Sequence, residues 1–133
     1  MISLWIGQVV NAMPARIVEI DATNASCLDA VAPDVFDNAV DAVQLNRFVG
    51  DPRHILVVAI DDGLVVGMAT AVEYFHPDKA PQLWINEVGV SPAYRGRRMR
   101  TRRAVFLNAC TERCVEVARS LGSRLLRTNV PGF

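Results

Sequence analysis

Cysteine and histidine are scarce in this chain of 133 residues, and their spacing excludes several kinds of site. The three cysteines, Cys27, Cys110 and Cys114, form no Cys-x-x-Cys pair, so they give neither a disulfide framework nor a zinc signature. Cys110 and Cys114 are four residues apart, which places them as buried thiols on one apolar face of an expected helix. The two histidines, His54 and His76, have no partner at the spacing of a metal site or a catalytic triad. We therefore expect no metal, and a reducing, cytoplasmic compartment.

Long apolar runs and low-complexity tracts are also missing. No segment approaches the roughly 18 consecutive apolar residues of a membrane-spanning helix, so we expect no membrane partner. Residues 1–6 are apolar but lack the basic region of a signal peptide. The hydrophobic content of 51% predicts a folded chain. We interpret 1–13 as an apolar leader of undetermined role and 14–133 as a single domain, with Met13 as an alternative start of that domain.

Acidic residues are rare in the last third of the chain, although the formal net charge is zero. Twelve of the fourteen acids precede Ser91, whereas ten of the fourteen basic residues lie between Arg95 and Arg127. Such a cationic segment suits a phosphorylated or otherwise anionic partner. A solvated basic helix face explains the same pattern, and composition alone leaves both readings open.

Hydrophobic periodicity and turn residues predict two short helices, a strand meander, a long helix and a last strand. The strand over 54–60 is apolar on both faces, so layers must cover the sheet above and below. Asp61-Asp62-Gly63 predicts a hairpin turn, and Asp41 is a suitable N-cap. The expected strands are 15–20, 54–60, 64–74, 83–90 and 125–130, and the expected helices are 25–31, 41–49 and 98 or 101 to 121.

The stretch from Leu83 to Arg100 carries the clearest functional signal. An apolar strand is ended by Ser91-Pro92, and an arginine-rich loop then leads into the long helix. The first turn of a helix leaves backbone N–H donors unpaired, so a strand, a tight loop and a helix in succession present donors to a phosphate.

Within this stretch, Val-Gly-Val-Ser-Pro-Ala-Tyr-Arg-Gly-Arg resembles the GNAT superfamily of N-acetyltransferases. The resemblance covers about 16–130 and is most specific over 85–97. The Asp61-Asp62-Gly63 turn before Val65-Val66-Gly67 is similar to the family's second and third strands, and the acid at position 87 is similar to that of aminoglycoside 3-N-acetyltransferases. The resemblance implies an α/β (α+β) fold with a mixed, largely antiparallel central sheet flanked by helices.

The resemblance also implies that acetyl-CoA is the co-substrate of an acetyl transfer to a primary amine of a small molecule, aminoglycoside-like or polyamine-like. Glu87 is then the candidate general base, and Asp34, Glu73 and Asp37 are candidates for an acidic acceptor site. The pantetheine arm would be bound by Val88, Gly89 and Val90. The phosphates would be bound by Arg95, Gly96, Arg97, Arg98, Met99, Arg100 and Thr101. Each assignment also has a simpler alternative. Glu87 can be a carboxylate that only attracts cations, and Gly89 can be an ordinary strand irregularity. The loop arginines can form a solvated basic cap, and the other three acids can be ordinary surface residues.

Three departures from the family pattern bear on activity. Arg98 and Arg100 occupy loop positions that hold glycine or another small residue in the family, where side chains crowd a pyrophosphate although guanidinium groups can themselves bind it. The long helix exceeds the usual length by about seven residues, or two turns. The chain also lacks the family's last helix and last strands. An uncapped final strand invites pairing, so we expect a homodimer.

Two other classes of function remain as alternatives. The chain can be a non-catalytic acyl-CoA-binding or anion-binding relic of an acetyltransferase, which keeps the binding site without turnover. A nucleic-acid-binding protein is the weaker alternative, because the basic stretch lacks interleaved aromatic residues and the domain is not basic overall.

Overall fold

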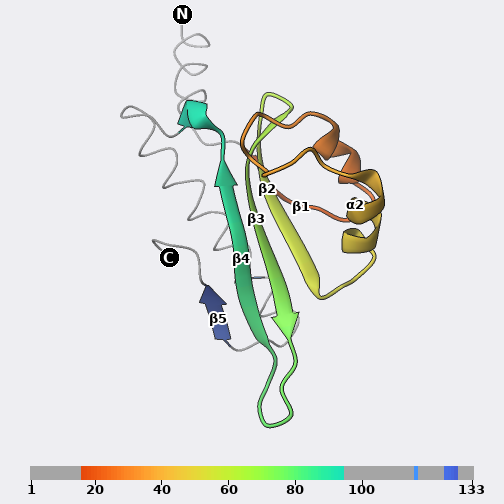
Figure 1. The fold of residues 1–133 in the computed structure, drawn as a ribbon, viewed down its shortest axis with the longest axis vertical. Coiled ribbons are helices and arrows are strands. Elements are labelled where there is room, and N and C mark those ends of the chain that lie inside the picture. The colour runs from red at the N-terminus through yellow and green to blue at the C-terminus, as the bar shows by residue number, and fades with distance from the viewer. Residues whose placement is uncertain (1–15, 95–115, 117–124, 129–133) are drawn as a thin grey trace, which may run out of the picture.

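The computed structural model describes residues 16–94, 116 and 125–128. Within these residues the chain forms a five-stranded sheet in the order β1-β2-β3-β4-β5 (Figure 1). Strands β1 to β4 are antiparallel neighbours, and β5 lies parallel to β4. The strands are β1 (Arg16–Glu19), β2 (His54–Asp61), β3 (Leu64–Tyr74), β4 (Gln82–Val90) and β5 (Leu125–Thr128). The mixed, largely antiparallel sheet expected from the sequence is confirmed.

The β2–β3 hairpin follows directly from its turn residues. Asp62 and Gly63 both have positive φ, 52° and 77°, which is the conformation of a two-residue type I′ turn. This turn matches the right-handed twist of the flanking strands. The predicted hairpin and the predicted strand over 64–74 are both confirmed.

Three helices are described: η1 (Ala25–Asp29), α2 (Ala42–Val49) and η2 (Pro92–Tyr94). The prediction for α2 is confirmed, because the Asp41 side chain accepts a hydrogen bond from the Gln44 backbone N–H at 2.9 Å. None of the described helices is long and apolar enough to cross a membrane. Figure 1 shows η1 and α2 together on one side of the sheet, beside β1 and β2.

The short helix predicted over 25–31 is present, but it is a 3-10 helix that ends two residues earlier, at Asp29. The side chain of Asn24 does not cap the helix, because its Oδ1 accepts from the Asp21 N–H and its Nδ2 donates to the Glu19 carbonyl. The chain then leaves the helix to pair with β3. There the Ala32 N–H donates to the Val65 carbonyl at 2.8 Å. The result is a short 3-10 helix followed by an extended segment.

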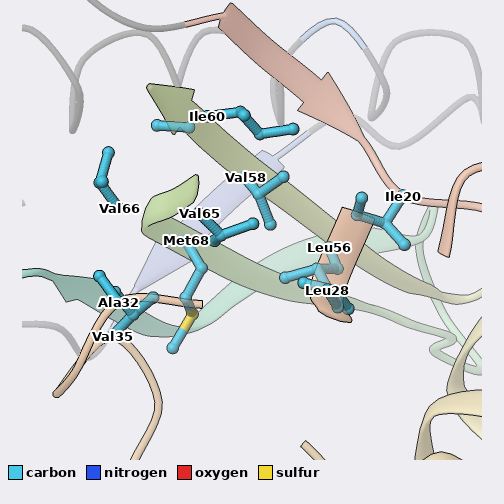
Figure 2. Packing of buried hydrophobic residues seen from close by; sticks show 11 residues of the cluster. Ile20, Leu28, Ala32, Val35, Leu56, Val58, Ile60, Val65, Val66 and Met68 are labelled. Carbon is cyan, nitrogen blue, oxygen red and sulfur yellow. The ribbon is translucent and has the colours of Figure 1, made fainter. Parts of the chain in front are cut away.

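The core is divided between the two faces of the sheet. One face, which η1 and α2 cover, contains Leu28, Val35, Leu56, Val58 and Met68 (Figure 2). Figure 2 shows Leu28 next to Leu56, and Met68 reaching toward the segment that carries Val35. The other face gathers a second cluster, formed by Ile55, Val57, Ala69, Ala71, Leu83 and Ile85. We call these the helix face and the opposite face. The expected leader over 1–13, the long helix to 121 and the end of the last strand lie outside the described residues.

Candidate functional site

A β-bulge in β4 determines which way the candidate base points. Thr70 of β3 pairs with Glu87, but the next residue, Ala71, pairs with Ile85, so Asn86 is the extra residue. Alternation along a strand has a period of two, and one inserted residue therefore moves all later side chains to the other face. Leu83 and Ile85 lie on the opposite face, whereas Glu87 lies on the helix face.

Glu87 lines a pocket between α2 and the sheet. The pocket has a volume of about 290 Å³, and three of its residues, Leu56, Thr70 and Glu87, are register neighbours on β2, β3 and β4. Leu45 and Phe48 of α2 and the loop over 36–41 form the other walls. The helix, the loop and the bulged strand thus bring an exposed carboxylate beside a largely apolar hollow.

The charge of this pocket is negative. Its lining residues, all within the described part of the chain, include Asp37, Asp41 and Glu87 but no lysine, arginine or histidine. Asp41 is engaged at the N-terminus of α2, as described above. Among the described residues, none forms a hydrogen bond or ion pair with the Glu87 carboxylate. The pocket therefore attracts cations, with Glu87 as the carboxylate available on the sheet.

Thr70 is a site residue that the sequence pattern did not reveal. Its Oγ1 is buried beside Glu87 and has no hydrogen-bond partner among the residues that the structure describes. A buried hydroxyl without a partner is unusual in a folded protein, and each case calls for an explanation. A threonine in an alternating strand gives no sequence signal of such a position.

A larger hollow of about 650 Å³ adjoins the pocket and shares the wall formed by Leu28, Phe36 and Asp37. Asp34, a predicted acceptor residue, lines this neighbouring hollow, where its φ of 63° places it in the left-handed region. Asp37 lines both hollows. Asp34 is therefore next to the Glu87 pocket but not in its wall.

Glu73, the other predicted acceptor residue, lies elsewhere. It is three residues after Thr70 on β3, and its register partner is Leu83, a member of the cluster on the opposite face. Its backbone N–H donates to the Arg53 carbonyl at 2.9 Å, near the end of the hairpin. The structure does not bring Glu73 to the pocket that Glu87 lines.

Gly89 is in close contact with the loop that carries Val35. A Cβ built on Gly89 would lie 1.9 Å from the Val35 carbonyl oxygen and 3.4 Å from Cε of Met68. Only a glycine leaves room for this main-chain approach. Gly89 thus fixes the loop against β4, two residues beyond Glu87, whereas Val88 faces the cluster on the opposite face.

The outer edge of β4 is paired over only part of its length. Within the described residues, the ladder between β4 and β5 covers Gln82 to Ile85. Residues 86–89, which include Glu87, Val88 and Gly89, have no partner strand on that side in the described part of the chain. The predicted phosphate-binding residues from Arg95 to Thr101 lie outside the described residues.

The sequence of this strand does not reveal the bulge. Its apolar residues are Leu83, Trp84 and Ile85 before Asn86, and Val88 and Val90 after it. Trp84 interrupts the alternation, so the inserted residue is evident only in the register of β3 and β4.

Comparison with known proteins gives a family and a fold. The family model described as Acetyltransferase (GNAT) family matches residues 20–100. An aminoglycoside acetyltransferase from an uncultured soil metagenomic sample is 17% identical, with 91% of this chain and 82% of that chain covered and a TM-score of 0.64. A ribosomal-protein-alanine N-acetyltransferase from Brucella melitensis biovar Abortus 2308 is 17% identical, with coverages of 88% and 80% and a TM-score of 0.62. An aminoglycoside N-acetyltransferase in complex with CoA is 14% identical, with coverages of 88% and 80% and a TM-score of 0.61.

A search of curated protein sequences finds no match. The solved structures are too distant in sequence to show more than the fold. The family match, in contrast, covers more than half of the chain and includes the bulged strand with Glu87. The resemblance noted in the sequence is confirmed, and the chain belongs to the GNAT acetyltransferase family.

Proposed function

We propose that the chain transfers an acetyl group from acetyl-CoA to a primary amine of a small molecule. One observation carries the proposal: the bulge at Asn86 turns the Glu87 carboxylate into a negatively charged pocket beneath α2. A cationic amine is attracted to such a pocket. A carboxylate with no hydrogen bond or ion pair to the described residues is free to take the amine's proton.

Glu87 acts as the general base, directly or through one water. An ammonium ion has no lone pair, so the substrate must lose a proton before its nitrogen attacks. Acetyl-CoA supplies an acyl group activated as a thioester. The new N–C bond forms as the C–S bond breaks. Of the two protons that the nitrogen loses, Glu87 takes the first before the attack and passes it to solvent, and the second goes to the CoA thiolate, which leaves as the thiol.

The edge of β4 next to Glu87 is where we place the pantetheine arm. Residues 86–89 have no partner strand on that side among the described residues, so their outward backbone groups can pair with an amide of the arm. In this proposal Val88, Gly89 and Val90 contact pantetheine, and the loop from Arg95 to Thr101 binds the phosphates.

Aminoglycoside-like and polyamine-like acceptors are the classes that the resemblance implies, and Asp34 would extend their binding site from the neighbouring hollow. We further propose that the chain is cytoplasmic and forms a homodimer; light scattering on the full chain tests the dimer.

The test is thiol release from acetyl-CoA with a panel of primary amines. We expect Glu87→Gln to lower kcat/KM by about 10² to 10⁴, the usual contribution of a general base. Its stability should be unchanged, because the side chain is exposed. Asp62→Asn is the matched control. It also removes one exposed carboxylate, and asparagine tolerates the positive φ of the turn.

Binding is measured separately by the thermal shift that acetyl-CoA produces. Stabilisation by acetyl-CoA without turnover of any amine would favour a non-catalytic binding module. Absence of both stabilisation and turnover would count against the proposed reaction and the binding module together.

A further inference from the structure

The Glu87 pocket has an apolar wall and an acidic wall, and both bear on the acceptor. The identity of the acceptor inferred from this pocket rests on the proposed function, because that function makes the pocket the acceptor site.

The apolar wall is formed by side chains that stay partly exposed. Leu45 and Phe48 of α2 are half-buried and pack against the core cluster that contains Leu28 and Leu56. The Phe48 ring is fixed by a tilted contact with His54, at 5.2 Å between ring centroids. A preformed apolar surface next to a hollow gains free energy when an apolar group covers it.

The acidic wall consists of Glu87 on the sheet and of Asp37 and Asp41 on the loop before α2. Asp41 also accepts the capping hydrogen bond from the Gln44 N–H. Glu87 is the carboxylate that the sheet contributes, in register with Thr70 and Leu56. An amine at Glu87 therefore has a counter-charge, whereas the adjoining part of the acceptor meets Leu28, Leu45 and Phe48.

We propose that the acceptor is a primary amine whose nitrogen is two or three bonds from an aryl or branched alkyl group. The amine lies at Glu87, and the apolar group packs against Leu45, Phe48 and Leu56. The pocket thus selects among small amines by apolar contact, with charge only fixing the orientation.

The experiment compares four acceptors with the full chain and acetyl-CoA: 2-phenylethylamine, ethylamine, spermidine and kanamycin. We expect kcat/KM for 2-phenylethylamine to exceed that for each of the others by at least about tenfold, because its ring covers the apolar wall. Ethylamine tests the ring, since it keeps the amine and lacks the apolar group.

The Phe48→Ala variant tests the wall. It should lower kcat/KM for 2-phenylethylamine by about tenfold, mainly through KM, and change that for ethylamine by less than about threefold. Val43→Ala is the matched control, because Val43 is on the same helix, is 65% exposed and does not line the pocket. If Phe48→Ala does not fold, Phe48→Leu replaces it. Phe48→Leu should lower kcat/KM by a smaller factor, again more for 2-phenylethylamine than for ethylamine.

The outcomes separate this inference from the proposed function. Efficient acetylation of spermidine or kanamycin, with 2-phenylethylamine poor, overturns the inference and leaves the acetyl transfer standing. If no amine is acetylated, binding of the same four amines to the full chain is measured by calorimetry. Tighter binding of 2-phenylethylamine than of spermidine then supports the inference although the proposed reaction fails, and the reverse order overturns both.

Discussion

Gly89 gives the sharpest test of how the site is built. A Cβ at this position would lie 1.9 Å from the main-chain oxygen of Val35, more than 1 Å inside the 3.0 Å that real Cβ atoms keep. The obstructing atom belongs to the backbone, so no side-chain rotation relieves the clash. Either β4 or the loop that carries Val35 must move. We expect Gly89→Ala to lower the free energy of unfolding by about 3 kcal/mol, at the upper end of overpacking substitutions.

Gly67 provides the matched control on the neighbouring strand. A Cβ at Gly67 would lie 3.6 Å from the Ala59 Cβ and 3.6 Å from the Gly89 carbonyl oxygen, which are ordinary contacts. Alanine there also reduces the entropy of the unfolded chain, so Gly67→Ala should be neutral or stabilising by up to about 1 kcal/mol. Both glycines are in β-strands, and intrinsic strand preference therefore cannot explain a difference between the two variants.

Urea denaturation at equilibrium measures the effect through the midpoint, with the slope showing whether compactness also changes. A Val35→Ala substitution added to Gly89→Ala should not restore stability, because the clash is with the carbonyl oxygen. The reasoning is refuted if Gly89→Ala is as stable as Gly67→Ala, or if Val35→Ala rescues it. Either result would mean that the loop does not pack on β4 as described.

Three further predictions address the surroundings of the site and the surface. Thr70→Val should raise the free energy of unfolding by about 1 kcal/mol, because it removes a buried hydroxyl that has no hydrogen-bond partner within the described part of the chain; a lower melting temperature in calorimetry would contradict this. The side-chain hydrogen bond from Arg53 lowers the pKa of Asp51 to about 2, below its ordinary 3.8, so this stabilisation is present above about pH 4 and is lost as the pH falls through about 2. Asp51→Asn should therefore be less stable than the parent in urea at pH 6 and equal to it near pH 2, and a gap that persists at low pH would disprove the assignment. Deletion of Asn86 should restore regular alternation, turn Glu87 to the opposite face and abolish thiol release, whereas Asn86→Ala should keep activity.

Much of the sheet could be predicted because its signals are local. The continuous aliphatic strand, the Asp62-Gly63 turn and the Asp41 cap each depend only on residues that are close together in the sequence. The helix predicted over 25–31 is shorter in the structure, and the reason is equally local. Asn24 has the side chain of a cap, but here it hydrogen-bonds to Asp21 and Glu19 instead. The residue type shows that an asparagine side chain can cap a helix. It does not show whether that side chain bonds to the N-terminus of the helix or to the residues that precede it.

The candidate site was harder to predict, because it depends on which face each strand residue takes. Glu87 and Glu73 are both acids on neighbouring strands, and both were predicted to belong to the site. The shift in register at Asn86 turns Glu87 toward α2, whereas Glu73 lies further along the β3–β4 ladder, beside Leu83. The pocket wall formed by Phe48 was also missed, since packing between a helix and a sheet does not follow from periodicity alone.

The same four residues of β4, 86–89, have two separate duties in the proposed function. Their helix face presents Glu87 to the acceptor pocket and closes on the Val35 loop at Gly89. Their outer edge, unpaired within the described residues, is where pantetheine would bind. A bulge serves both duties, because one inserted residue changes the direction of the side chains and disturbs regular pairing at the same place. A thioester held along this edge therefore lies within a few residues of the carboxylate that takes the proton, so binding and proton transfer depend on one irregularity in one strand.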